Sequence, residues 1–274
     1  MKHLKLILTF ISMLTISGVK AQTDFTIPGP NGNLSAVIVK PEVAQGEKAP
    51  MVIVCHGFMG NKESNLLIAI SDSLKEAGIA SIRFDFDGHG KSGGKFEDMT
   101  VPKEIADAKT VYDYVRTLPY VSEIGMVGHS QGGVVTAMTA GELGDRDIRA
   151  VALLAPAAVL RDDALRGTIM GKTYNPHAVP DSGVPLWGGF ILGKQYVETA
   201  QTLPIYKTAA RYRGPALILH GTYDTVVPYT YGERFHDIWP ESKLVLIPGV
   251  DHGFTGHEAQ AAALVADFML KHLK

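Results

Sequence analysis

The residues with the clearest potential for chemistry surround Ser130, in a Gly-His-Ser-Gln-Gly stretch at 128–132. An apolar segment at 123–127 predicts a buried strand before it, and residues 134–140 suit a helix after it. Gly-x-Ser-x-Gly between a strand and a helix is typical of a nucleophile elbow, in which glycines keep Cβ atoms out of a strained corner. The alternative is a glycine-rich turn that contains a serine by chance. The strand and helix around the turn favour a nucleophile.

A serine hydroxyl is a weak nucleophile and needs a histidine base that is oriented by an acid. In folds with this elbow, the acid and the histidine follow the serine along the chain, each just beyond the end of a strand. Asp224 follows the predicted strand 216–220, and His252 follows the last predicted strand, 243–247. We therefore expect Ser130, Asp224 and His252 to form a catalytic triad.

Three other residues are alternatives for the acid and the base. Asp251 adjoins His252, but a sequence neighbour rarely points at the same imidazole. His257 falls where the final helix is expected to begin, and we expect it at the surface. His129 lies inside the elbow, where we expect its ring to turn away from the nucleophile. Asp224 and His252 therefore remain the predicted acid and base.

An oxyanion hole needs backbone N–H groups near the nucleophile. We expect the N–H of Gln131 to be one of them, because this residue begins the helix after the elbow. The other should come from the loop after the predicted strand 51–55, where a His-Gly pair lets the backbone curl toward the serine. Phe58 is the candidate in that loop, with Met59 as the alternative.

Strands and helices alternate along the chain, which is the pattern of a mostly parallel sheet covered by helices on both faces. Residues 34–40 alternate enough to predict an early, half-exposed strand. Short apolar runs that predict further strands occupy 51–55, 80–86, 123–127, 150–155, 216–220 and 243–247. Apolar residues suited to helices occupy 64–77, 101–118, 134–140, 229–238 and 257–272. The expected fold class is α/β, and a length of 274 residues suits one such domain.

Residues 160–213 interrupt this alternation and are too long for a plain connection in a compact domain. The segment is rich in glycine and proline, and it carries the large side chains Met170, Tyr174, Trp187, Phe190, Tyr196 and Tyr206. We interpret it as a cap inserted over the site. The alternative is an extra lobe that makes no contact with the substrate.

Residues 1–21 have the composition of a signal peptide. Two lysines give a basic start, 4–16 is mostly apolar, and a small-residue cleavage site ends at Ala21. The mature chain would then be 22–274, a single domain located in the periplasm or secreted. The alternative is an uncleaved anchor, although the apolar run is short for a membrane span.

Composition argues against several other functions. The formal net charge of −2 leaves no basic footprint for nucleic acid. The single cysteine, Cys55, cannot form an internal disulfide, and the ten histidines show no metal-binding spacing. The glycine-rich loop 88–93 has the residue pattern of a dinucleotide-binding fingerprint but lacks its structural context, because the loop continues where a helix would have to begin. We expect no metal, no cofactor, no nucleic-acid partner and no stable membrane anchor.

Together these motifs resemble the α/β-hydrolase superfamily along the whole chain after residue 21. The resemblance rests on His-Gly-Phe at 56–58, Asp-Phe-Asp-Gly-His-Gly-Lys-Ser at 85–92, Gly-His-Ser-Gln-Gly-Gly at 128–133, Gly-Thr-Tyr-Asp-Thr-Val-Val-Pro at 221–228 and Asp-His at 251–252. More narrowly, the chain is similar to the bacterial cinnamoyl (feruloyl) esterases. That similarity rests on Leu-Ala-Pro-Ala-Ala at 154–158, Asp-Ala-Leu at 163–165, Thr-Tyr-Asn-Pro at 173–176, Gly-Gly-Phe at 188–190 and Leu-Pro-Ile-Tyr at 203–206.

The resemblance implies an α/β-hydrolase fold with a cap over the acyl group of an ester. It also implies that Asp163 helps to hold a phenolic hydroxyl. We expect Trp187, Phe190 and Met170 to supply apolar walls. The family places glutamine at the position of Met170 and tyrosine at that of Ile191. This chain therefore has fewer hydrogen-bonding groups at the expected phenol end.

The function expected from the sequence is a serine esterase that cleaves small-molecule hydroxycinnamate (feruloyl) esters through an acyl-enzyme. One alternative is the same machinery acting as a lipase, an acylglycerol-type esterase or a peptidase. Another is a binding protein that has kept the fold and lost catalysis. The sequence leaves the oligomeric state open.

Overall fold

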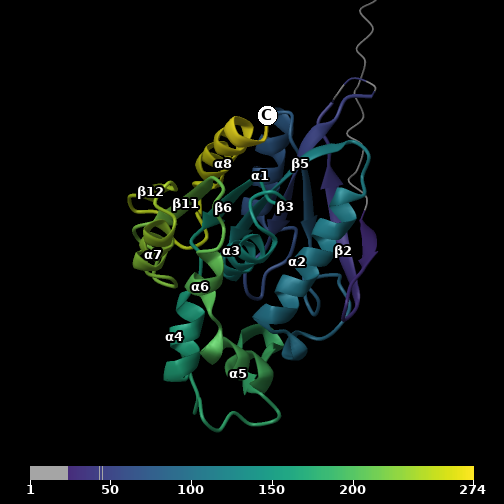
Figure 1. Ribbon diagram of the computed structural model, residues 1–274. Helices are drawn as coiled ribbons and strands as arrows, with labels where there is room; N and C mark the ends of the chain where they lie inside the picture. The colour runs from purple at the N-terminus through teal and green to yellow at the C-terminus, as the bar shows by residue number, and fades with distance from the viewer. Residues whose placement is uncertain (1–23, 43, 45) are drawn as a thin grey trace, which may run out of the picture.

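The computed structural model describes residues 24–42, 44 and 46–274, so the signal peptide expected at 1–21 lies outside the described residues. The main sheet has eight strands in the order β1-β2-β4-β3-β5-β6-β11-β12 (Figure 1). Its strands are β1 (Phe25–Pro28), β2 (Asn33–Val39), β3 (Ala49–Cys55), β4 (Ala80–Phe84), β5 (Val121–His129), β6 (Ala150–Leu154), β11 (Ala216–Gly221) and β12 (Lys243–Ile247).

Most of this sheet is parallel. From β4 to β12 in this order the strands run parallel to one another, whereas β2 is antiparallel both to β4 and to the edge strand β1. Parallel strands that are covered on both faces are mostly apolar, as in β3, where every residue is buried. Because β5, β11 and β12 point the same way, residues that follow their carboxyl ends gather at one edge of the sheet.

Helices cover both faces of the sheet (Figure 1). On one face, α1 (Asn65–Glu76) and α8 (Glu258–Leu273) contact each other over a core that includes Val54 and Leu217. On the other, α2 (Val101–Arg116), α3 (Gln131–Leu143) and α7 (Thr230–Ile238) pack over a core that includes Ile53 and Ile218. This arrangement confirms the α/β class and the mostly parallel, two-sided sheet expected from the sequence.

The segment between β6 and β11 is built from short elements. Along the chain these are α4 (Val159–Arg166), β7 (Thr168–Ile169), β8 (Lys172–Thr173), β9 (Val184–Pro185), the 3₁₀ turn η2 (Trp187–Gly189), β10 (Ile191–Leu192), α5 (Lys194–Thr202) and α6 (Ile205–Ala209). β7 pairs with β8, and β9 pairs with β10, in two small antiparallel sheets. Figure 1 shows α4 and α5 projecting beyond one end of the main sheet. The range expected for the insertion, 160–213, corresponds to this segment.

Two features differ from the expected elements. β1 is absent from the expected strands, because four residues that end in a proline are too short to show an alternating pattern. The strand expected over 80–86 ends at Phe84, since the carboxylate of the next residue, Asp85, accepts hydrogen bonds from Lys62 and from the N–H of Lys91 and so draws the chain into a loop.

In the part of the chain that the structure describes, no helix has the length and apolarity needed to cross a bilayer.

Candidate active site

Ser130 lies in the turn between β5 and α3 with a φ of 57° and a ψ of −122°. A positive φ is unfavourable for a residue with a side chain, so the surrounding backbone must enforce it. The glycines of the turn allow this close packing. A Cβ on Gly128 would lie 2.1 Å from the carbonyl oxygen of Gly132, and a Cβ on Gly132 would lie 2.3 Å from that of His56. The structure therefore contains the strained strand-to-helix turn that the sequence indicates.

The side chains of Ser130, His252 and Asp224 form one hydrogen-bonded chain. Nε2 of His252 lies 2.9 Å from Oγ of Ser130, and its Nδ1 lies 2.7 Å from Oδ2 of Asp224. An ionised carboxylate can only accept, so the imidazole carries its proton on Nδ1 and leaves Nε2 to accept from the serine hydroxyl. The three residues are thus arranged as a nucleophile, a base and an orienting acid.

The carboxylate of Asp224 is held on both oxygens. Oδ1 accepts the backbone N–H groups of Val226 and Val227, at 2.9 and 2.8 Å. Oδ2 faces His252 and also Nε2 of His220, which lies 3.2 Å away. Burial works to raise the pKa of Asp224, but the hydrogen bonds from His220 and His252 outweigh it and hold that pKa well below its usual range. Asp224 therefore stays ionised at neutral pH, as the orienting role requires.

The residues considered as alternatives make other contacts. Oδ1 of Asp251 accepts the backbone N–H of Thr255 at 2.8 Å, and this contact lowers the pKa of Asp251. His257 is exposed at the start of α8. His129 bonds away from the nucleophile, because its Nε2 donates to the carbonyl oxygen of His252 at 2.8 Å. Burial lowers the pKa of His129 to about 4, which keeps the ring neutral. His129 thus supports the backbone of the base, a contact that the sequence does not indicate.

The backbone N–H groups of Phe58 and Gln131 are available for an oxyanion, since neither donates a hydrogen bond to another described residue. Both residues line the same pocket as Ser130. The side chain of Gln131 is fixed at both ends: the hydroxyl of Tyr196 donates to Oε1 at 2.7 Å, and Nε2 donates to Glu104 at 2.8 Å. These contacts hold the first residue of α3 in place. Met59, the alternative to Phe58, has a φ of 57°.

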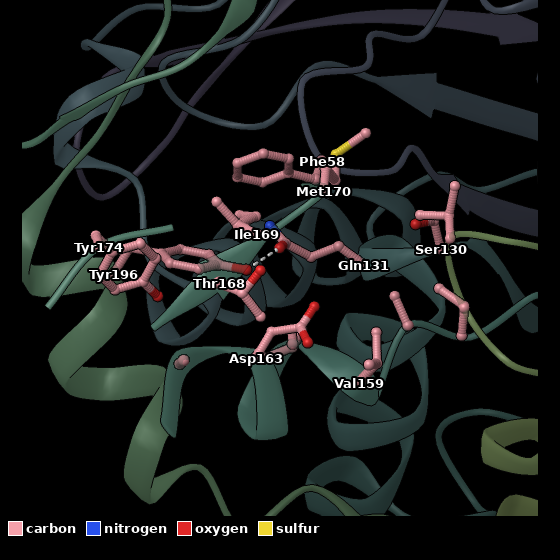
Figure 2. A pocket seen from close by; sticks show the side chains of 15 residues that line it. Phe58, Ser130, Gln131, Val159, Asp163, Thr168, Ile169, Met170, Tyr174 and Tyr196 are labelled. Atoms are coloured by element: carbon pink, nitrogen blue, oxygen red, sulfur yellow. Dashed lines mark hydrogen bonds between the residues drawn. The ribbon is translucent and has the colours of Figure 1, made fainter. Parts of the chain in front are cut away.

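Ser130 opens into a pocket of about 520 Å³, its mouth included. Figure 2 shows Ser130 at one side of this pocket, Tyr174 and Tyr196 at the opposite side, and the carboxylate of Asp163 between them. The apolar lining comes mainly from Phe58, Ala157, Val159, Leu160, Ala164, Ile169, Met170, Val226 and Val227. The pocket thus offers an apolar space for one half of a substrate, with polar groups at a distance from the nucleophile.

Asp163 lies on the face of α4 that lines the pocket. Its carboxylate makes no hydrogen bond or ion pair with another described residue, and burial raises its pKa. Burial, together with the charge of Asp163, also raises the pKa of the neighbouring Tyr174 to about 12. A partly buried acceptor without a partner is suited to a hydroxyl or an ammonium group of a ligand. Asp163 therefore lies in the pocket that contains Ser130, and its role in holding a phenolic hydroxyl stays a prediction.

Trp187 is not brought into the pocket with the other candidate residues. It is 43% exposed in η2, and the ammonium of Lys172 lies 5.2 Å from its ring centre. Phe190 packs against Phe96, with ring centres 4.7 Å apart, and Ile191 also lies outside the lining. Of the apolar walls expected from the insertion, Met170 alone lines the pocket. Trp187 and Phe190 lie outside the pocket because they belong to the loop that connects the short paired strands β9 and β10.

Three polar residues of the pocket were not identified as contacts from the sequence: Thr168, Tyr174 and Tyr196. Tyr196 lies on the buried face of α5 beside Val197 and Ala200. A tyrosine in such an apolar stripe normally needs a hydrogen-bond partner for its hydroxyl, and that requirement is a usable signal. The partner, Gln131, lies next to the nucleophile.

Two other features raised by the sequence are its potential for metal binding and the glycine-rich loop 88–93, which lies outside this pocket. Within the described ranges, no group of three or more His, Cys, Asp or Glu side chains could hold a metal ion. The glycine-rich loop 88–93 wraps around Asp85, where a Cβ on Gly90 would lie 2.3 Å from a carboxylate oxygen. Lys62 is buried beside the same carboxylate, at 3.0 Å. The loop therefore packs around a buried ion pair.

Two family models match the chain. Residues 46–185 match a family described as serine aminopeptidase S33, and residues 192–255 match the family described by the α/β-hydrolase fold. Est1E from Butyrivibrio proteoclasticus, solved with ferulic acid bound, is 35% identical and superposes with a TM-score of 0.86 over 91% of this chain and 99% of that one. A second structure of Est1E is 32% identical, with a TM-score of 0.82 over 91% and 98% of the two chains.

A curated relative is more distant. The mitochondrial palmitoyl-protein thioesterase of Mus musculus is 23% identical over 222 residues, which are 75% of this chain and 69% of the relative. The match to half of the chain by a single family model, together with the likeness to Est1E over nearly its whole length, decides the family. The chain belongs to the α/β-hydrolase superfamily, and the resemblance to the feruloyl esterases drawn from its sequence is confirmed.

Proposed function

We propose that this hydrolase is a serine esterase that cleaves hydroxycinnamate esters through an acyl-enzyme, with Ser130, His252 and Asp224 as the triad. The observation that carries the proposal is the continuous hydrogen-bonded chain from Asp224 to Ser130, which opens into a pocket containing the unpartnered carboxylate of Asp163. The likeness to Est1E, a protein solved with ferulic acid, supports the choice of acyl group.

The reaction follows from this geometry. Oγ of Ser130 attacks the ester carbonyl carbon while Nε2 of His252 takes the hydroxyl proton. The N–H groups of Gln131 and Phe58 stabilise the negative oxygen of the tetrahedral intermediate. As the intermediate collapses, His252 returns the proton to the leaving alcohol, and the acyl group stays on Ser130. Water, activated by the same imidazole, then releases the acid.

The lining of the pocket suits an aromatic acyl group. Phe58, Ile169 and Met170 supply apolar contacts, and Asp163 accepts a hydrogen bond from a phenolic hydroxyl. A ligand without that hydroxyl leaves the carboxylate unpaired, which costs about 1–3 kcal/mol. Met170 has no hydrogen-bonding group for a second ring oxygen. We therefore expect hydroxylated cinnamates to be preferred over plain cinnamates by about tenfold rather than by thousands.

A hydrolysis panel tests the proposal: methyl ferulate, methyl cinnamate, medium-chain nitrophenyl esters and aminoacyl amides, each with wild type and Ser130→Ala. Ser130→Ala should lose about 10⁴-fold or more in activity, and all labelling by a fluorophosphonate, with little change in its thermal midpoint. A variant that kept a tenth of the activity would exclude Ser130 as the nucleophile. Wild-type protein that is fast on octanoate esters but has no measurable cinnamate turnover would reject the feruloyl specificity and leave the esterase mechanism.

One other function has a specific observation in its favour. The family model over 46–185 is described as an aminopeptidase, and the carboxylate of Asp163 could pair with the free ammonium of an aminoacyl group. The aminoacyl amides in the panel separate the two functions. Turnover of these amides that exceeds turnover of methyl ferulate, and that is lost in Asp163→Ala, would replace the esterase by a peptidase.

A further inference from the structure

A second histidine, His220, lies behind the acid of the proposed triad. It stands near the carboxyl end of β11, and its side chain is fully buried. Its Nε2 lies 2.9 Å from the carbonyl oxygen of Val227 and 3.2 Å from Oδ2 of Asp224. Its Nδ1 is also buried and has no hydrogen-bond partner among the described residues. Because both neighbours of Nε2 are acceptors and Nδ1 faces none, the proton of a neutral imidazole belongs on Nε2.

We propose that His220 is a positioning residue for the catalytic acid: its Nε2–H clamps the turn 224–227 and shares the negative charge of Asp224 with His252. This inference rests on the proposed function, because it assigns His220 a task within the same triad. The side chain of His220 does not line the substrate pocket, and it acts through Asp224 and the turn that follows it.

The clamp closes a small ring of contacts. The N–H of Val227 donates to Oδ1 of Asp224, while the carbonyl of Val227 accepts from His220. His220 therefore holds both the turn and the carboxylate, and the plane of the carboxylate stays directed at Nδ1 of His252. Loss of the clamp lets this turn rotate, and a small misplacement at a base is costly in rate.

The shared charge has a second consequence. A carboxylate that also accepts the N–H of His220 presents less of its charge to Nδ1 of His252, so removal of that N–H should change the pH dependence of the rate. The other titratable groups around this pair act elsewhere. His129, from β5, is neutral and bonds to the backbone of His252, and the exposed carboxylate of Asp251 is engaged by Thr255. From α7 the residue facing His220 is the uncharged Gly232.

The absence of a side chain at Gly232, on α7, leaves room for the ring of His220. A Cβ on Gly232 would lie 2.7 Å from Nδ1, a distance that the buried ring could relieve only by moving. Gly232→Ala therefore displaces the imidazole while leaving its chemistry intact. It provides a perturbation of the clamp that is independent of any substitution at 220.

The test uses His220→Leu, His220→Gln and His220→Asn in the full chain. Glutamine places an amide N–H where Nε2 stands, whereas asparagine places it near Nδ1. In His220→Leu we expect kcat to fall by about tenfold or more with little change in KM. The acid limb of the rate profile should move to higher pH, because the full charge of Asp224 then acts on His252. Glutamine should restore most of both losses and asparagine should not. The control is His236→Leu, on the same helix as Gly232 but bonded to Ser242.

Rates are normalised to the fraction of sites titrated by a fluorophosphonate, and the protonation midpoint of His252 is followed directly by NMR. Losses that only track the titrated fraction, with an unmoved acid limb, would make His220 structural and overturn the proposal. If His220→Leu does not fold, identical profiles for glutamine and asparagine overturn it instead. Wild-type protein that does not label would reject the proposed esterase, while the NMR midpoint would still decide whether His220 acts on the Asp224–His252 pair.

Discussion

Asp224→Asn replaces the carboxylate of the proposed acid by an amide of the same size, and so tests its role in orienting His252. The Oδ1 position is surrounded by the N–H groups of Val226 and Val227, so an amide at 224 must place its oxygen there. Its NH₂ group then occupies the Oδ2 position, 2.7 Å from Nδ1 of His252. A donor at that position requires Nδ1 to accept, which moves the imidazole proton to Nε2. The histidine is then held in the wrong tautomer.

With a proton on Nε2, His252 can no longer take the proton of the Ser130 hydroxyl, 2.9 Å away. We expect a loss of about 10⁴-fold in kcat, which corresponds to roughly 5.5 kcal/mol of transition-state stabilisation. KM should change little, because Asp224 does not line the acyl pocket. The thermal midpoint should fall only modestly, since the amide keeps both backbone hydrogen bonds to its oxygen and loses only the contact with His220.

Steady-state hydrolysis of a nitrophenyl ester, with a thermal melt to confirm folding, measures this loss. Asp251→Asn is the matched control, because it makes the same chemical change next to His252 at a carboxylate that faces Thr255. The control should stay within about twofold of wild type, as expected for a surface residue outside the triad. Equal losses in the two variants, or a tenth of the activity remaining in Asp224→Asn, would refute the assignment of the acid.

Three further predictions concern specificity, stability and export. Asp163→Ala should erase the preference for methyl ferulate over methyl cinnamate while leaving plain cinnamate turnover little affected; a preserved preference would remove Asp163 from the site. Burial raises the pKa of Asp107 to about 7, above its value in the unfolded chain. The protonated carboxyl therefore adds its full contribution to the free energy of unfolding below about pH 4, and this contribution is lost as the pH rises through 7. Asp107→Asn, which keeps an acceptor for the N–H of Asp87, should flatten the decline of the melting temperature between pH 4 and 7, and parallel curves would contradict this. We also propose export, with Gln22 as the mature N-terminus; an intact mass that retains Met1 would reject it.

The hydrogen-bonded arrangement of Ser130, His252 and Asp224 could be predicted from the sequence because it depends on the sheet. Ser130, Asp224 and His252 each follow a strand of the parallel sheet, and parallel strands bring their carboxyl ends to one edge. Each strand is a continuous apolar run, which is a strong local signal. Chain order and strand ends were therefore sufficient to select Asp224 over its rivals.

The walls of the pocket could not be predicted in the same way. Trp187 is a large aromatic residue in the insertion, which favoured a role as a wall, yet the path of the chain through strands of two residues each carries it to the surface. Such short elements have no periodicity that would reveal which side chains face inward. Asp163 and Tyr196 reach the pocket from helices, α4 and α5, whose buried faces are set by packing against each other.

Two of the histidines, His129 and His220, show why residue type alone does not identify a supporting contact. His129 and His220 both sit at the ends of strands, and both donate from Nε2 to a carbonyl oxygen, of His252 and of Val227 respectively. Each contact joins residues from separate strands or across a turn, so its partner depends on the three-dimensional path of the chain. The sequence can place the three reacting groups at one edge of the sheet, whereas the alignment of their side chains to within hydrogen-bonding distance depends on these buried partners. For that reason, a substitution at His220 should lower kcat and alter the pH dependence of the reaction, although the side chain of His220 does not itself line the acyl pocket.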